Sequence, residues 1–201
     1  MPLWLPEPLV LASRSAVRHG ILREAGIPLE VEPADIDERA LEAASVIRDA
    51  PGVAVLLARA KAHAIAARRP GRLVLGADQT LALGERRFSK PADRAAAHAQ
   101  LRALRGRTHE LHTAIALVRD DSVLFERRET ARLTMRDFSD AFLEAYLDAA
   151  GNAVTASVGA YQLERTGVQL FERIEGDHFV ILGLPLLPLL AFARGAGWLA
   201  A

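Results

Sequence analysis

The stretch that decides the fold is residues 9–18, Leu-Val-Leu-Ala-Ser-Arg-Ser-Ala-Val-Arg. Its first four residues form an apolar run of the kind found in buried strands. Three polar residues interrupt the run, and residues 16–25 then predict a helix that ends at Gly26. A buried strand that turns directly into a helix is typical of α/β proteins.

The rest of the chain continues this alternation and then changes character. Short apolar runs predict strands, and apolar residues at helical spacing predict helices. Residues 34–39 predict a loop or short turn. The expected strands are 28–31, 73–77 (ending at Asp78-Gln79), 110–118, 123–135 and a short one near Ala160-Tyr161. The expected helices are 51–69, 92–104, 140–149 with Ser139 as its cap, and a terminal helix. Hairpins are expected at 81–88 and 169–174.

Strands alternate with helices early, whereas hairpins dominate late. We therefore expect an α/β protein built on a mixed β-sheet flanked by helices. A length of 201 residues suits one domain over 1–201 or two closely packed lobes.

Composition excludes several classes of protein. The 25 Lys and Arg residues balance 25 Asp and Glu residues, so a general nucleic-acid binder with its excess of cations is not expected. The absence of Cys excludes disulfide scaffolds, thiolate zinc sites and cysteine nucleophiles. No segment has the pattern of an export signal or a membrane span, so we expect no membrane association and an intracellular location.

Lysine is scarce in a chain rich in arginine: Lys61 and Lys90 stand against 23 Arg. A coding bias toward Arg explains the imbalance. Under such a bias the two retained lysines indicate function, because lysine is a compact point charge that arginine does not replace everywhere. Chance retention is the alternative.

A candidate anion site follows the first strand. A strand-to-helix turn directs backbone N–H groups and the helix dipole at a ligand. Ser13 and Ser15 add hydroxyl groups, and Arg18 can form a bidentate contact with phosphate oxygens. The alternative is a simple helix cap beside a surface arginine.

Two acidic stretches are candidates for metal or proton chemistry. Asp78 follows an apolar run and is expected to emerge at a sheet edge, where a carboxylate can bind a metal or accept a proton from water. The loop at 35–38 carries Asp35, Asp37 and Glu38, which could hold Mg²⁺ or Mn²⁺. A turn-forming Asp and a solvated acidic loop are the alternatives.

Lys90 is expected at a helix start, where the dipole disfavours a cation unless an anion shares the site. His109 and His112 do not have metalloprotease spacing, and on a strand residues three apart face opposite sides. The chain contains no Gly-rich phosphate loop and no Gly-x-Ser-x-Gly elbow.

Eight short motifs, taken in order, resemble the Maf-like nucleoside triphosphate pyrophosphatases over nearly the whole chain. They are LASRSAVR (11–18), LARAKA (57–62), GADQ (76–79), SKPAD (89–93), LRGRTH (104–109), SVGAY (157–161), IEGD (174–177) and GLPL (183–186). The resemblance implies an elongated α/β fold with a central cleft, frequent homodimers, a cytoplasmic location and a divalent metal, Mg²⁺ or Mn²⁺. It implies hydrolysis of a nucleoside triphosphate between the α and β phosphates, which yields a monophosphate and diphosphate.

The resemblance also implies roles for individual residues. Asp78 matches the proton acceptor, Glu38 the loop glutamate that could share the metal with Asp78, and Lys61 and Lys90 the two motif lysines. Ser13, Ser15 and Arg18 would hold phosphate oxygens. Together these residues would offset the charge of the leaving diphosphate.

Departures from the family pattern concern substrate preference. Val17 fits neither the arginine of the dTTP/UTP branch nor the aromatic residue of the 7-methyl-GTP branch. Gln79 and Glu164 resemble the 7-methyl-GTP branch. Two alternatives therefore stay open: an enzyme specific for 7-methyl-GTP, and a non-catalytic nucleotide-binding regulator of cell division.

Overall fold

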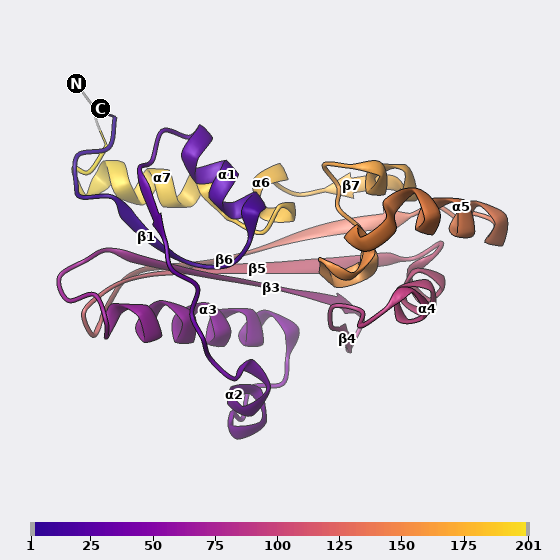
Figure 1. Ribbon diagram of the computed structural model, residues 1–201, viewed down its shortest axis with the longest axis horizontal. Coiled ribbons are helices and arrows are strands. Elements are labelled where there is room, and N and C mark those ends of the chain that lie inside the picture. Colours follow the sequence, from indigo (N-terminus) through magenta and orange to yellow (C-terminus); the bar gives the residue numbers. More distant parts are fainter. Residues whose placement is uncertain (1–2, 200–201) are drawn as a thin grey trace. The chain divides into compact units, whose positions relative to one another are not determined.

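The structure is a computed structural model that describes residues 3–199. Within them, seven strands form one sheet. Their order is β2 (Leu29–Val31), β1 (Leu9–Ala12), β3 (Val74–Leu83), β5 (Thr108–Arg119), β6 (Ser122–Met135) and β7 (Phe171–Glu175), with β4 (Arg86–Phe88) paired to β3. Strand β1 runs parallel to β2 and β3, whereas β3–β4 and β6–β7 are antiparallel. The expected mixed sheet with flanking helices is confirmed (Figure 1).

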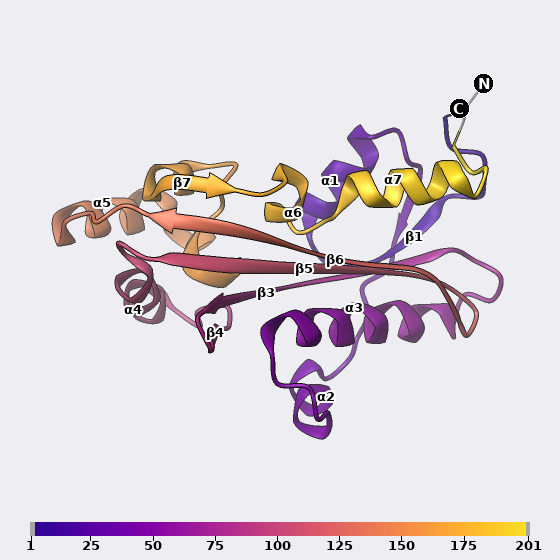
Figure 2. The ribbon, with the colours of Figure 1, turned by 180° about the vertical axis from the view of Figure 1, so that it is seen from behind.

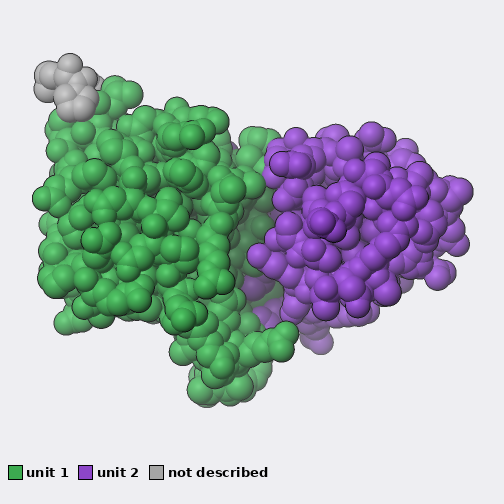
Figure 3. All heavy atoms as spheres, viewed as in Figure 1, with its two compact units in different colours: residues 1–79, 113–129, 178–201 green, residues 80–112, 130–177 purple. Residues whose placement is uncertain are grey.

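The chain divides into two compact units, which Figure 3 colours separately. Unit 1 comprises residues 1–79, 113–129 and 178–201, and unit 2 comprises residues 80–112 and 130–177. Three strands have residues in both units: β3 (Val74–Leu83), β5 (Thr108–Arg119) and β6 (Ser122–Met135).

Unit 1 contains the parallel strands and most of the long helices. Its own elements are β1 (Leu9–Ala12), α1 (Ala16–Glu24), β2 (Leu29–Val31), α2 (Glu38–Ala44), α3 (Ala50–Ala66), α6 (His178–Ile181) and α7 (Leu186–Gly195). Helices α1 and α7 lie on one side of its strands and α3 on the other, as both ribbon views show (Figure 1 and Figure 2).

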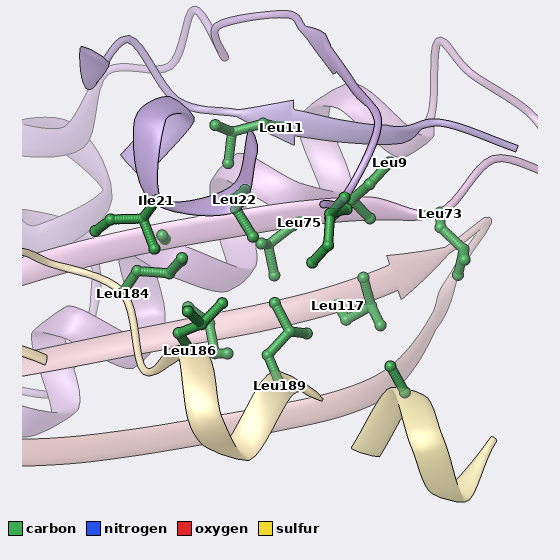
Figure 4. Close-up of a cluster of buried hydrophobic side chains, with 14 of the residues drawn as sticks. Leu9, Leu11, Ile21, Leu22, Leu73, Leu75, Leu117, Leu184, Leu186 and Leu189 are labelled. Carbon is green, nitrogen blue, oxygen red and sulfur yellow. The ribbon is translucent and has the colours of Figure 1, made fainter. Parts of the chain in front are cut away.

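Alternating strand residues form a separate core on each face of unit 1. Leu9 and Leu11 of β1 face α1 and α7, and their cluster also holds Leu75, Leu117 and Leu189 (Figure 4). The intervening β1 residues, Val10 and Ala12, face α3 together with Val74. This two-sided burial explains why the strands appear in sequence as continuous apolar runs rather than as alternating ones.

Helix α3 packs closely on the sheet at Gly76, where both surfaces are made of small residues. Ala58 and Ala62 are fully buried against the sheet. A Cβ atom added to Gly76 would lie 2.1 Å from the carbonyl oxygen of Ala58 and 2.7 Å from the backbone nitrogen of Ala62. The glycine is therefore required for the observed spacing between α3 and β3.

Unit 2 has its own elements and its own buried residues. The elements are β4 (Arg86–Phe88), α4 (Arg94–Leu104), α5 (Asp140–Ala150), β7 (Phe171–Glu175) and the short 3₁₀ segments Gly151–Thr155, Val158–Ala160 and Thr166–Leu170. As expected, Ser139 caps α5, and its hydroxyl accepts a hydrogen bond from the Phe142 backbone at 3.2 Å. The expected 81–88 hairpin is confirmed by pairing of Leu81 with Phe88.

Several expectations for the elements were wrong. Strand β3 does not end at Asp78; it continues to Leu83, because its later residues pair with β4. Asp78 therefore lies inside a strand and not at its end, two residues beyond the last pair between β1 and β3. Residues 38–44 form helix α2. Its sequence has no apolar stripe at helical spacing, because none of its residues is buried.

Further differences lie late in the chain. Ala160 belongs to a 3₁₀ segment rather than a strand. Residues 171–175 pair with β6, which is distant in sequence. The expected hairpin over 169–174 would have paired neighbouring residues instead. The four-residue α6 was also not foreseen, since it is too short to show periodicity. Among residues 3–199, no helix has the length and apolarity to cross a membrane.

Candidate active site

The site begins at the carboxyl end of β1, where the order in which the chain adds strands to the sheet reverses. The chain leaves β1 through α1 to reach β2 on one side, and returns through α3 to β3 on the other. Ligands of open α/β sheets bind at such switch points, outside the carboxyl ends of the strands. Pairing of β1 with β3 ends at Ala12 and Gly76, two residues before Asp78.

The turn after β1 is held by its two serines. The Ser13 hydroxyl accepts a hydrogen bond from the Ser15 backbone at 3.2 Å, and Ser13 is buried. The Ser15 hydroxyl caps α1 by accepting from the Arg18 backbone at 3.3 Å. Ser15 thus has the structural role that was the alternative to phosphate binding, and the first turn of α1 is fixed in direction.

Arg18 is bound to the protein rather than projecting from its surface. Its Nε donates to the Gly183 carbonyl at 2.7 Å, and its Nη1 donates to the Ala77 carbonyl at 2.9 Å and the Ser13 hydroxyl at 3.2 Å. Burial lowers the pKa of the guanidinium, while Asp78 and Glu38 raise it. Arg18 therefore supplies a fixed positive charge beside the strand that carries Asp78.

Asp78, Lys61 and Glu38 form the centre of the site. The Lys61 Nζ lies 2.5 Å from Asp78 Oδ1 and 2.8 Å from Glu38 Oε1. Three elements bring them together: α3 carries Lys61, β3 carries Asp78, and α2 begins at Glu38. The Lys61 and Asp78 side chains are only 13% and 12% exposed, whereas Glu38 is 47% exposed. The ammonium thus lies between a buried carboxylate and one that faces solvent.

Burial is the main influence on the Asp78 carboxyl. Loss of solvation raises its pKa, and the charges of Lys61 and Arg18 oppose that rise. A buried carboxyl group with a raised pKa beside two cations has the properties required of a proton acceptor.

The carboxylates also fit a divalent cation. Both Asp78 and Glu38 direct an oxygen at one point, which is now the position of the Lys61 ammonium. Within residues 3–199 no three His, Cys, Asp or Glu side chains surround a common point. Mg²⁺ commonly binds through one or two carboxylates together with waters and substrate phosphates, so a pair of carboxylates meets its requirements.

Gln79 is committed to contacts within unit 1. Its amide nitrogen donates to the Thr113 hydroxyl at 2.8 Å and to the carbonyls of Val180 and Ile181 at 3.1 Å each. Gln79 thereby ties β3 to α6. Val17 packs against the α1–α7 face of the core. Both side chains have structural contacts in addition to any influence on substrate preference.

The remaining residues from the sequence analysis lie outside this cluster. Lys90 and Glu164 belong to unit 2, where both are exposed. In the acidic loop, Asp37 caps α2 by accepting from the Ala40 backbone at 3.0 Å. Asp35 is exposed and lies 3.9 Å from Arg14. Only Glu38 of this loop reaches the centre of the site.

Two contributors were not singled out from sequence. The Ala77 and Gly183 carbonyls accept hydrogen bonds from Arg18. Every residue has a backbone carbonyl, so the sequence does not show which of them bind a side chain. Gly76 was not recognised as the cause of close helix packing. A glycine within an otherwise apolar strand is the available signal, since it often marks close approach of another backbone.

Several known proteins are similar to this chain over nearly its whole length. The chain is 59% identical to a "Nucleoside triphosphate pyrophosphatase" of Rhodopseudomonas palustris, with 100% of each chain covered. It is 59% identical to a protein of the same name from Bradyrhizobium diazoefficiens, over 96% of each. A "7-methyl-GTP pyrophosphatase" of Mesorhizobium japonicum is 51% identical, over 96% of this chain and 98% of that protein.

Solved structures and family profiles complete the comparison. The Staphylococcus aureus Ham1 protein aligns with a TM-score of 0.44 and 16% identity, over 65% of this chain and 73% of that chain. The profile of the family described as "Maf-like protein" matches residues 8–196. The chain therefore belongs to the Maf-like protein family.

Proposed function

We propose that the protein is a nucleoside triphosphate pyrophosphatase. It hydrolyses the α–β phosphoanhydride of its substrate and releases a nucleoside monophosphate and diphosphate. The observation that carries the proposal is the Lys61–Asp78–Glu38 cluster at the sheet's switch point. The names of relatives that match over 96–100% of the chain support the same activity.

The chain's own residues supply the proton transfer and part of the charge. Asp78 accepts a proton from the attacking water. The oxygen of that water bonds to the α-phosphorus, and the bond between the α-phosphorus and the α–β bridging oxygen breaks. The leaving diphosphate gains negative charge, which Lys61 and Arg18 offset. The first turn of α1, fixed by Ser13 and Ser15, offers backbone N–H groups to phosphate oxygens.

A divalent cation completes the proposed site. Asp78 and Glu38 would hold Mg²⁺ or Mn²⁺, which would neutralise phosphate charge and polarise the reacting groups. Lys90 is proposed as a further phosphate ligand because it matches the second motif lysine of the family.

A 7-methylated guanine nucleotide is the second candidate substrate. One relative, 51% identical, has a name that specifies 7-methyl-GTP. Gln79 and Glu164 agree with that preference by resemblance. A broad nucleotide preference and this narrow one predict different rank orders in a substrate panel.

The test is diphosphate release across a panel of common and methylated nucleoside triphosphates, with and without Mg²⁺ or Mn²⁺. Asp78→Asn should reduce turnover by at least about 1,000-fold, because the proton acceptor is lost and the charge balance changes. Asp35→Asn is the matched control, since Asp35 is exposed and outside the cluster. Tight nucleotide binding by the wild type without turnover would instead favour a non-catalytic regulator.

A further inference from the structure

The Lys61 ammonium holds the position that a cation between the two carboxylates would take. Its Nζ contacts Asp78 Oδ1 at 2.5 Å and Glu38 Oε1 at 2.8 Å. With the Lys61 and Asp78 side chains almost fully buried, the ammonium compensates a charge that water reaches poorly. In the free protein, Lys61 is thus the counter-ion of both acids.

A divalent ion and this ammonium cannot share the position. Like charges a few ångström apart repel strongly in a partly buried site, and a doubly charged ion would repel the ammonium more than a singly charged one would. Either the divalent ion stays away or the ammonium moves. The lysine side chain is flexible enough to swing its head away, which the fixed Arg18 is not.

We propose that Lys61 is a resident cation that a divalent metal ion displaces from Asp78 and Glu38. Its freed ammonium then becomes a ligand for the phosphates of the substrate. This exchange couples the two ligands: metal binding releases a cation that needs an anion, and a bound triphosphate supplies that anion. By linkage, the triphosphate raises metal affinity by the same factor as the metal raises triphosphate affinity.

The inference rests on the proposed function only for the identity of the polyanion. The displacement itself concerns metal binding to the free protein, which is measurable without substrate or turnover. Failure of the two proposals is therefore distinguishable: absent diphosphate release counts against the function, and unchanged metal affinity counts against the displacement.

The decisive experiment is Mn²⁺ titration of substrate-free protein, followed by the electron paramagnetic resonance signal of the free ion. Lys61→Met removes the competing charge with a side chain of similar length, so the dissociation constant should fall at least about tenfold. Lys61→Arg, which keeps the charge, should retain affinity close to wild type. Asp78→Asn should weaken binding, because one metal ligand becomes neutral.

A matched control lies one half-turn away on the same helix. Arg59→Met also removes one positive charge from α3, but Arg59 pairs with Glu126 and not with the acids of the site. Its Mn²⁺ affinity should stay within about twofold of wild type, since exposed charges are screened. Binding by Lys61→Met that is no tighter than binding by Arg59→Met would overturn the proposal.

A second measurement uses the wild type and so does not depend on the folding of a variant. Because the chain has two lysines, Lys61 and Lys90, ¹³C-lysine labelling yields only two sets of side-chain signals. Assignment follows from Lys90→Arg, which removes one set. Diamagnetic Mg²⁺ should shift the Lys61 Cε resonance as its ammonium leaves the carboxylates. A Lys61 resonance that stays constant while Mg²⁺ saturates the protein would refute displacement.

Discussion

At the scale of single residues, the roles of polar groups follow from what each one contacts. Arg18 and Lys61 are both cations near Asp78, yet among residues 3–199 Arg18 is held by two backbone carbonyls and Lys61 by two carboxylates. The arginine is therefore part of the framework, whereas the lysine is free to exchange partners. This difference in partners gives the two cations different roles beside the same carboxylate.

His109 gives a prediction about stability rather than catalysis. It is fully buried in unit 2, its Nε2 lies 2.7 Å from the Tyr161 hydroxyl, and burial lowers its pKa to about 4. The unfolded chain, with a His pKa of about 6.5, binds a proton that the folded protein does not. The free energy of unfolding should thus decrease as pH falls from 6.5 to 4, by up to about 3 kcal/mol.

Urea denaturation at a series of pH values checks this prediction. His109→Phe keeps an aromatic ring beside Tyr161 and Phe171 and should lose less unfolding free energy than wild type between pH 6.5 and pH 4. At pH 7 the same variant should be less stable than wild type by about 1–3 kcal/mol, because the Tyr161 hydroxyl loses its partner. His63→Gln, at a partly exposed position of α3, should leave the decrease unchanged. Equal pH dependence in wild type and His109→Phe would show that His109 is not the cause.

At the scale of elements, the site depends on how closely α3 packs on β3. Gly76 lies two residues before Asp78 on the same face of the strand, and Ala62 is next to Lys61. The absence of a side chain at Gly76 therefore sets the distance between the helix that carries the lysine and the strand that carries the acid.

Gly76→Ala should reduce kcat by about 100-fold, because a displacement of about 1 Å in a catalytic group has effects of that size. The added Cβ would meet backbone atoms, which cannot rotate away, so α3 itself must move. Gly20→Ala is the control: a Cβ there has no neighbour within 4 Å. Full activity of folded Gly76→Ala would show that the spacing is not critical.

Gln79 connects β3 to α6 and gives a second prediction at this scale. Gln79→Glu replaces a donor with an acceptor opposite the carbonyls of Val180 and Ile181. The free energy of unfolding should fall by about 1–3 kcal/mol, as for other broken buried hydrogen bonds. Gln169→Glu, at an exposed position, should change it by less than about 0.5 kcal/mol. Equal stability of the two variants by urea denaturation would refute the structural role of Gln79.

At the scale of the whole molecule, the sequence predicted the early elements well because their signals are local. The apolar run 9–12, the capped helix after it and the long α3 all have the expected type and nearly the expected bounds. Composition drew attention to Lys61, and resemblance to the Maf-like family drew attention to Asp78; neither indicated that the two side chains are in contact.

The failures share a different physical cause, which is dependence on partners distant in sequence. Strand β3 continues past Asp78 because another strand pairs with it, and β7 joins β6 rather than a sequence neighbour. Helix α2 buries no residue and so has no periodic signal. Local sequence patterns also could not predict the geometry of the site. Arg18 is held by two backbone carbonyls, and the sequence does not show which carbonyls bind it.

In the proposed function, the Lys61–Asp78–Glu38 site breaks the α–β bond of a nucleoside triphosphate. Product analysis by ³¹P NMR tests it most directly, with wild type and Asp78→Asn incubated with substrate and Mg²⁺ or Mn²⁺. Wild type should yield nucleoside monophosphate and diphosphate in equal amounts, and the variant should yield no detectable product in the same time. Nucleoside diphosphate with inorganic phosphate, or equal turnover by the variant, would contradict it.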